Sequence, residues 1–306
     1  MPKFNPLDYP ISLSKPVRVV PPTAWIEHIP FALFLIDLLR PRLLVELGTH
    51  SGNSFCAFCQ AVKELDLDTK CFAVDTWEGD AQAGFYGSEI LEDLRSHHDA
   101  FYGGFSRLIQ STFDEAVKYF SNGTVDLLHI DGLHTYEAVR HDFENWLPKL
   151  SARGVVVFHD VNVRERDFGV WKVWDELKEK YPGFEFSHGH GLGVLAVGAE
   201  YPASLDVLLK SPPDEALLIK DYFYQIGFRL ESEYQVKTLT ARVENNEQTI
   251  LLLRDQISNL VAQHQDHINQ LHEQIRMIQT SESWRLIQFL GRVRSFVFPF
   301  GKRGKQ

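Results

Sequence analysis

"VELGTHSGNS", residues 45–54, follows an apolar run and combines an acidic residue, glycines and small hydroxyl side chains. Gly48 permits a tight turn after a strand, and Gly52 allows the backbone to approach a ligand without a clashing Cβ atom. Asn53 or Ser54 can begin a helix and cap its first turn. The segment therefore predicts a strand, a ligand-binding loop and a helix, in that order.

The chain around this segment alternates between strand-like and helix-like stretches. Short apolar runs are the predicted strands, at 43–47, 71–75, 107–111, 125–131 and 154–160. Helix-length segments flank them, at 30–39, 53–65, 86–99, 113–121 and 135–150. The closing runs 184–189 and 193–198 are too near each other for a parallel crossover, so they predict a hairpin. We therefore predict an α/β fold: a doubly wound, Rossmann-like, seven-stranded and mostly parallel sheet that ends in an antiparallel hairpin.

Composition limits the classes of function. The 306 residues are 44% hydrophobic, enough for one sizeable core with an appendage or for two small domains. A net charge of -10 argues against nucleic-acid binding. No apolar stretch approaches the ~20 residues of a membrane span. The few cysteines favour a reducing, cytoplasmic location, and for Cys56 and Cys59 we favour packing in a buried helix over a redox or zinc role.

The second half of the chain has a different pattern. Segment 232–279 lacks Pro and Gly, and its apolar residues recur at alternating steps of three and four. This spacing predicts a coiled coil of about six heptads, with an extra four-residue step at His264. Asn246 occupies a seam position, so we expect a homo-oligomer; a helix folded back on the domain is the alternative. The apolar seam residues are Val236, Leu239, Val243, Ile250, Leu253, Ile257, Leu260, Ile268, Leu271, Ile275 and Ile278.

The C-terminal tail, residues 280–306, mixes aromatic and basic side chains. This composition suits an anionic membrane surface or a protein partner, and a frayed tail is the alternative. The predicted organisation is an irregular N-terminal segment at 1–22, an α/β domain at 23–200, a helical connector at 201–231, the coiled coil at 232–279 and this tail.

The residues at the strand ends indicate the ligand. In a doubly wound sheet, ligands bind at the carboxyl ends of the strands, where the strand order reverses. The loop reads G-x-x-x-G, not the G-x-G-x-x-G of a nucleotide pyrophosphate site, and Glu46 before it suits a cationic amine. Asp75 ends the second strand and can accept hydrogen bonds from a ribose diol, while Trp77 can stack on a purine. An amino-acid end, a ribose and an adenine without phosphate describe S-adenosylmethionine.

With this loop and Asp75, residues 40–198 resemble the class I S-adenosylmethionine-dependent methyltransferases. The resemblance implies that the loop and the ends of the next strands hold the cofactor; an ordinary strand-to-helix turn is the alternative for the glycines. The candidate cofactor-binding residues are Glu46, Gly48, Thr49, Ser51, Gly52, Asn53, Ser54, Asp75, Thr76, Trp77, Thr112 and Phe113.

A second group of polar residues follows the fourth and fifth strands, in "HIDGLHTYEAVRHD" (129–142) and "FHDVN" (158–162). Asp131 and Asp160 end strands that we expect to be neighbours, so their carboxylates could share a divalent ion. His134 could act as a base near neutral pH. A Mg²⁺ ion on a hydroxyl oxygen would help that hydroxyl to lose its proton.

These stretches resemble metal-dependent O-methyltransferases that methylate sugars of macrolide antibiotics, and the related cephalosporin-hydroxylase-like proteins. The resemblance implies that Asp131 binds Mg²⁺ and that His134 is the base, which makes both catalytic. The predicted metal ligands are Asp131, Asp160 and His159. His159 stands where the subgroup has an acid and is a softer ligand. Capping for Asp131, surface packing for His134 and core packing for His159 are the alternatives.

The loops at 79–90 and 163–174 are predicted to form a lid, where Arg164 and Arg166 could hold a phosphate or uronate of the acceptor. We predict an O-methyltransferase acting on a sugar hydroxyl of a surface polysaccharide or glycolipid. The coil and tail would hold it at the inner membrane, with a glycosyltransferase as partner. A non-methyltransferase enzyme on the same scaffold and a coiled-coil assembly protein with a cofactor-binding domain are the alternatives.

Overall fold

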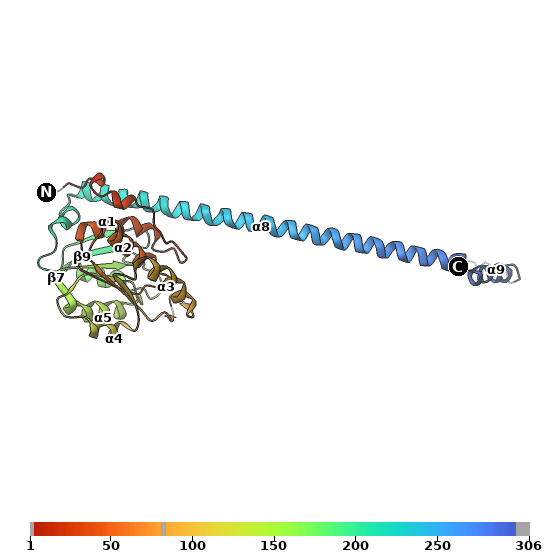
Figure 1. Ribbon diagram of the computed structural model, residues 1–306, viewed down its shortest axis with the longest axis horizontal. Helices are drawn as coiled ribbons and strands as arrows, with labels where there is room; N and C mark the ends of the chain where they lie inside the picture. Colours follow the sequence, from red (N-terminus) through yellow and green to blue (C-terminus); the bar gives the residue numbers. More distant parts are fainter. Residues whose placement is uncertain (1–2, 81, 83, 298–306) are drawn as a thin grey trace, which may run out of the picture. The chain divides into compact units, whose positions relative to one another are not determined.

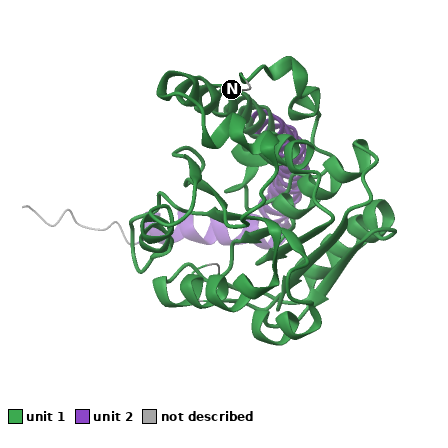
Figure 2. Cartoon of the chain, turned by 90° about the vertical axis from the view of Figure 1, so that its left-hand side faces the viewer, with its two compact units in different colours: residues 1–235 green, residues 236–306 purple. Residues whose placement is uncertain are grey.

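The computed structural model describes residues 3–80, 82 and 84–297. The chain divides into two units, Met1–Gln235 and Val236–Gln306, which Figure 2 shows in different colours. The first unit contains the sheet, and the second continues the long helix α8. Among the described residues, no helix combines the length and the apolar character needed to cross a bilayer.

The main sheet has seven strands in the order β5-β2-β1-β6-β7-β9-β8. Its strands are parallel except β9, which is antiparallel to β7 and β8. This confirms the doubly wound sheet and its terminal hairpin. The strands are β1 Leu43–Leu47, β2 Lys70–Asp75, β5 Ser106–Gln110, β6 Val125–Ile130, β7 Leu150–His159, β8 Gly183–Phe186 and β9 Leu192–Ala196. A separate small pair, β3 Gly79–Asp80 and β4 Gly84–Phe85, was not predicted.

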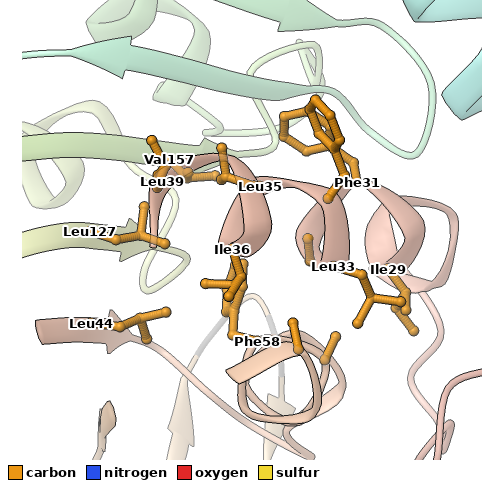
Figure 3. Packing of buried hydrophobic residues seen from close by; sticks show 14 of the residues in the cluster. Ile29, Phe31, Leu33, Leu35, Ile36, Leu39, Leu44, Phe58, Leu127 and Val157 are labelled. Carbon is orange, nitrogen blue, oxygen red and sulfur yellow. The ribbon is translucent and has the colours of Figure 1, made fainter. Parts of the chain in front are cut away.

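Helices cover both faces of the sheet. Neighbouring residues of a strand point to opposite sides, and in these strands the side chains on both sides are mostly apolar and need a cover. Leu44 packs in the core with α1, α2 and α3, whereas Val45 packs in the core with α4, α5 and α6. Figure 3 shows Ile36 of α1 near Phe58 of α2. The helices are α1 Ile29–Leu39, α2 Asn53–Glu64, α3 Glu89–Tyr102, α4 Phe113–Ala116, α5 Tyr136–Trp146, α6 Val170–Leu177 and α7 Asp206–Leu209.

The segment predicted as a connector, residues 201–231, is part of the first unit and packs against its other elements. It contains α7 and the start of α8, Pro213–Thr280 (Figure 1). Phe223 of α8 is fully buried and contacts Phe31 of α1, with ring centroids 5.2 Å apart. This part of the chain therefore belongs to the same hydrophobic core as the sheet.

Two predicted segments differ from the structure in their local conformation. Residues 163–174 were predicted as a loop, but α6 begins at Val170 because its apolar side chains are buried against β7. Of segment 113–121, only Phe113–Ala116 is α-helical, and a 3-10 turn follows at Val117–Tyr119.

Candidate functional site

The loop after β1 adopts a conformation that requires glycine at two positions. Gly48 has a φ angle of 84° and Gly52 one of 82°. A Cβ atom on Gly48 would lie 2.1 Å from the carbonyl oxygen of Asp131, and one on Gly52 would lie 2.4 Å from Leu94 Cδ1. Gly52 therefore makes room for α3, and the ligand approach predicted for it does not match its surroundings.

The N-terminal segment holds the start of α2. Asn53 Nδ2 donates to the carbonyl oxygens of Val20 and Pro22, at 2.7 and 2.8 Å, and its Oδ1 accepts from the Val20 amide. The N-cap residue of α2 is Gly52, and no side chain caps the helix there. The capping role predicted for Asn53 or Ser54 is therefore wrong, because the Asn53 amide is occupied by residues that lie far away in the sequence.

Asp75, at the end of β2, fixes the glycine loop. Its Oδ2 accepts hydrogen bonds from the amides of Thr49 and His50, at 2.7 and 2.9 Å, and its Oδ1 accepts from the Trp77 amide at 2.8 Å. Asp75 also lines the cavity described below. It is thus positioned to bind a ligand and to hold the loop that surrounds it.

Glu46 lies behind the loop, outside the cavity wall. Its side chain is fully buried, and its Oε2 lies 2.8 Å from Nδ1 of His129. On β1 it points to the same face as Leu44, which α1 and α2 cover, and burial raises the pKa of its carboxyl although His129 opposes the shift. The direct contact with a ligand amine predicted for Glu46 does not fit this position.

Trp77 is also buried, with its indole Nε1 donating to the carbonyl oxygen of His50 at 2.9 Å. It does not line the cavity, so the purine stacking predicted for it does not fit either. Tyr86, from the predicted lid at 79–90, lines the cavity and contacts the His50 ring edge-on at 4.6 Å. Sequence reasoning missed both Tyr86 and His50.

A cavity of about 830 Å³ opens at the carboxyl ends of the parallel strands. Its wall combines the glycine loop, the ends of β2, β6 and β7, and the loop before α6. Of the predicted site residues, Glu46, Gly52 and Trp77 lie outside the wall. Those in the wall are Gly48, Thr49, Ser51, Asn53, Ser54, Asp75, Thr76, Thr112, Phe113, Asp131, His134, His159 and Asp160.

The acids and histidines after β6 and β7 form one cluster. His134 Nε2 lies 2.9 Å from Asp160 Oδ2 and 3.4 Å from Asp131 Oδ1. His159 Nδ1 lies 3.3 Å from Asp131 Oδ1 and 3.2 Å from Asp160 Oδ2. The sheet brings them together because β6 and β7 are adjacent and parallel.

The charges of this cluster shift the pKa of each member. Burial alone would lower the pKa of both histidines, but the two carboxylates outweigh it and raise the pKa of His134 to about 9 and of His159 to about 10. Burial would raise the pKa of Asp131 and Asp160, but the histidines hold it well below its usual range. At neutral pH the cluster therefore holds imidazolium and carboxylate groups in contact.

Distant segments orient His134. Its backbone amide donates to Gln82 Oε1 at 2.9 Å, and its Nδ1 lies 3.1 Å from the same oxygen. The ring of Phe168 stacks on the imidazole, with centroids 4.8 Å apart. Neither Gln82 nor Phe168 was predicted, because each comes from a loop without a motif of its own.

Within the described ranges, two groups of side chains place ligand atoms within 4.8 Å of one another, as a metal site requires. One contains Asp131, His134 and Asp160, and the other contains His159, Asp160 and His190. The predicted ligands are divided between these groups, which share Asp160. Arg164 and Arg166 line the same cavity, and the Arg164 guanidinium lies 4.5 Å from the centre of the Trp171 ring.

Comparison with known proteins finds a matching family model and a similar protein. The family model of a methyltransferase domain matches residues 45–161. The chain is 48% identical over 232 residues to the uncharacterized protein y4gI of Sinorhizobium fredii (strain NBRC 101917 / NGR234). The aligned region covers 76% of this chain and 25% of the relative. The chain thus spans a quarter of the length of that curated relative.

Two solved structures are similar to part of the chain. The SAH-bound methyltransferase PaMTH1 of Podospora anserina has a TM-score of 0.43 and 16% identity, over 55% of this chain and 76% of its own. A methyltransferase of Geobacter sulfurreducens has a TM-score of 0.42 and 14% identity, over 64% of this chain and 89% of its own.

Proposed function

We propose that the protein is an S-adenosylmethionine-dependent O-methyltransferase, a proposal that the match of residues 45–161 to the family model of a methyltransferase domain supports. The observation that carries the proposal is the shared cavity. One wall has the glycine loop with Asp75, and another has Asp131, His134 and Asp160. A cofactor site and a group able to remove a proton therefore face the same space.

The cavity wall fits this cofactor. The cavity volume of about 830 Å³ lies in the range of binding sites for small molecules. Among the described side chains, Thr49 Oγ1 and His50 Nδ1 are buried without a hydrogen-bond partner, and both residues line the cavity. A buried polar atom without a partner is costly, so these atoms are suited to bind a polar ligand. Asp75 remains our candidate for the ribose hydroxyls.

The acid–histidine cluster also fits a divalent cation. Asp131 and Asp160 provide the oxygen donors that Mg²⁺ prefers, while the imidazoles of His134 and His159 suit borderline metals such as Fe²⁺ or Zn²⁺. We keep Mg²⁺ as the proposed ion. When bound, it would lower the pKa of an acceptor hydroxyl. Chelation followed by addition of single metals tests this.

The chemistry that we propose is an in-line displacement: the acceptor oxygen forms a bond to the methyl carbon while the bond from that carbon to the sulfonium breaks. The cavity contributes alignment of the two reactants. His134, which Gln82 and Phe168 hold in place, takes the proton of the acceptor hydroxyl. Because Asp131 and Asp160 raise its pKa to about 9, any positive charge that neutralises them frees His134 to act as a base.

The acceptor that we propose is a sugar hydroxyl of a polysaccharide or glycolipid. Arg164 and Arg166 on the cavity wall support an anionic group on that acceptor, such as a phosphate or a uronate. If Arg164→Gln and Arg166→Gln left the KM for an anionic glycan unchanged, this part of the proposal would fail.

The C-terminal region supports a location near a membrane. Helix α9, Glu282–Val297, is exposed along its length and carries Trp284 and Phe289 beside arginines. We propose that it contacts an anionic bilayer from one side, next to a glycosyltransferase that supplies the acceptor. The rest of the tail, residues 298–306, lies outside the described residues.

Transfer of a labelled methyl group from S-adenosylmethionine to glycan fractions tests the function. We expect His134→Gln to reduce transfer by about 10²- to 10⁴-fold, because it removes the base without changing the cofactor wall. His141→Gln, an exposed histidine paired with Asp114, is the matched control and should keep its activity. Cofactor binding without any transfer would favour the assembly-protein alternative.

A further inference from the structure

An exposed apolar stripe runs along the part of α8 that belongs to the second unit. It consists of the apolar seam residues named above, whose exposed fractions range from 44% for Ile268 to 63% for Val236. Large apolar residues outside the seam are Leu251, Leu252, Val261 and Met277. A helix with such a stripe and a polar remainder is stable in water when a partner covers the stripe.

The two sets of seam positions differ in side-chain shape. In the heptad notation abcdefg, Val236 is an a position and Leu239 a d position. The heptad count restarts at Ile268, after the extra four-residue step at His264. The further a positions with apolar residues are then Val243, Ile250, Ile257, Ile268 and Ile275. The further d positions with apolar residues are Leu253, Leu260, Leu271 and Ile278. Every apolar a residue is thus β-branched, and leucine dominates at d.

This distribution selects one kind of assembly. In parallel coiled coils, β-branched residues at a with leucine at d favour two strands, whereas other distributions favour three or four. We infer that residues 236–278 form a parallel, in-register, two-stranded coiled coil with a second copy of this chain. The inference does not depend on the proposed activity.

The charged residues beside the seam match this orientation. In a parallel pair, a g residue of one helix faces the e residue of the following heptad on the other helix. Arg242 is at g and Glu247 is at the following e, so the helices would face each other with opposite charges at both symmetric places.

Asn246 supports the same register. It occupies a d position between Val243 and Ile250. A parallel in-register pair places the two Asn246 side chains opposite each other, where their amides can form a hydrogen bond. A shifted register would set each amide against an apolar side chain and leave it without a partner, which costs free energy.

The mass of the full chain in solution gives the first test. Sedimentation equilibrium should give twice the 35.2 kDa of one chain. The mass of a monomer, or of three or four chains, would overturn the inference.

Cross-linking tests the orientation. The native cysteines Cys56, Cys59 and Cys71 are buried, so a single added cysteine reports on the coil. Leu239→Cys should form an interchain disulfide on mild oxidation, because parallel in-register helices place the two side chains together. Glu244→Cys, on the outer face, is the control and should not. A dimer in which Leu239→Cys stays uncross-linked would be antiparallel or shifted and would refute the inference.

Charge reversal tests the predicted pair. Arg242→Glu or Glu247→Arg should each raise the dissociation constant of the dimer by about tenfold, because like charges then meet at both symmetric places. The double variant Arg242→Glu/Glu247→Arg should restore it. Glu244→Arg makes the same change of charge on the outer face and should have little effect. Additive weakening in the double variant would show that these residues do not face each other.

Discussion

At the residue scale, His159 has the higher pKa of the two histidines in the acid–histidine cluster. Its imidazole is fully buried between Asp131 and Asp160, which outweigh burial and raise its pKa from 6.5 to about 10. A group whose pKa is higher in the folded state stabilises the fold fully below its unfolded pKa, and this contribution is lost as the pH rises through the folded value.

We therefore expect the free energy of unfolding of the metal-free protein to fall as the pH rises from about 6.5 to about 10. Thermal unfolding in the presence of a chelator, measured across this range, would show a decreasing midpoint. His159→Gln cannot titrate, so its profile should be flatter, whatever its absolute stability. An equally steep profile in the variant would mean that His159 is not the source.

The residues of the site were predictable to different degrees. The common location of Asp75, Asp131 and Asp160 was predictable, because each ends or follows a parallel strand and the carboxyl ends of parallel strands meet at one edge of the sheet. The predicted ligand contacts of Glu46 and Trp77 do not fit the structure, because the direction of each side chain depends on tertiary contacts. Glu46 points to the face that α1 and α2 cover, and the Trp77 indole donates to the His50 carbonyl oxygen.

At the scale of elements, the turn after β1 depends on glycine. Gly48→Ala should lower the free energy of unfolding by about 3 kcal/mol, since it adds left-handed strain and a clash with the Asp131 backbone. Chemical unfolding of the full chain measures this. Gly123 has a φ of 71° with open space around it, so Gly123→Ala adds strain without a clash and should cost only about 1 kcal/mol. Equal costs would show that the close packing at Gly48 is unimportant.

The coil of the second unit offers another test at this scale. Asn246→Leu should raise the melting temperature of the helix, because an apolar side chain replaces a polar one in the seam, and it should broaden the range of oligomers. Circular dichroism and the mass in solution measure the two effects. Asn245→Leu changes the same residue type outside the seam and should leave both properties unchanged. A lower melting temperature for Asn246→Leu would place Asn246 outside the seam.

The sequence predicted elements better than their contacts. Alternation of apolar runs identified the strands of the main sheet, and the short gap before β9 identified the hairpin. The start of α8 was assigned to a connector because its pattern does not reveal that Phe223 is buried against Phe31. Such burial depends on tertiary packing between segments distant in sequence.

At the scale of the whole molecule, residues 45–161 match the family model of a methyltransferase domain, and a long helix exposes an apolar seam. We propose that the domain transfers methyl groups and that the helix pairs two copies. The relative from Sinorhizobium fredii is much longer than this chain, which spans a quarter of it.

Calorimetric titration of the full chain with S-adenosylmethionine, and with its demethylated product, tests the central claim most directly. The account predicts saturable binding of both at one site per chain. Asp75→Ala should bind both ligands more weakly, since it removes the ribose acceptor and loosens the loop. The absence of any binding heat from either nucleoside, with a folded protein, would contradict the account.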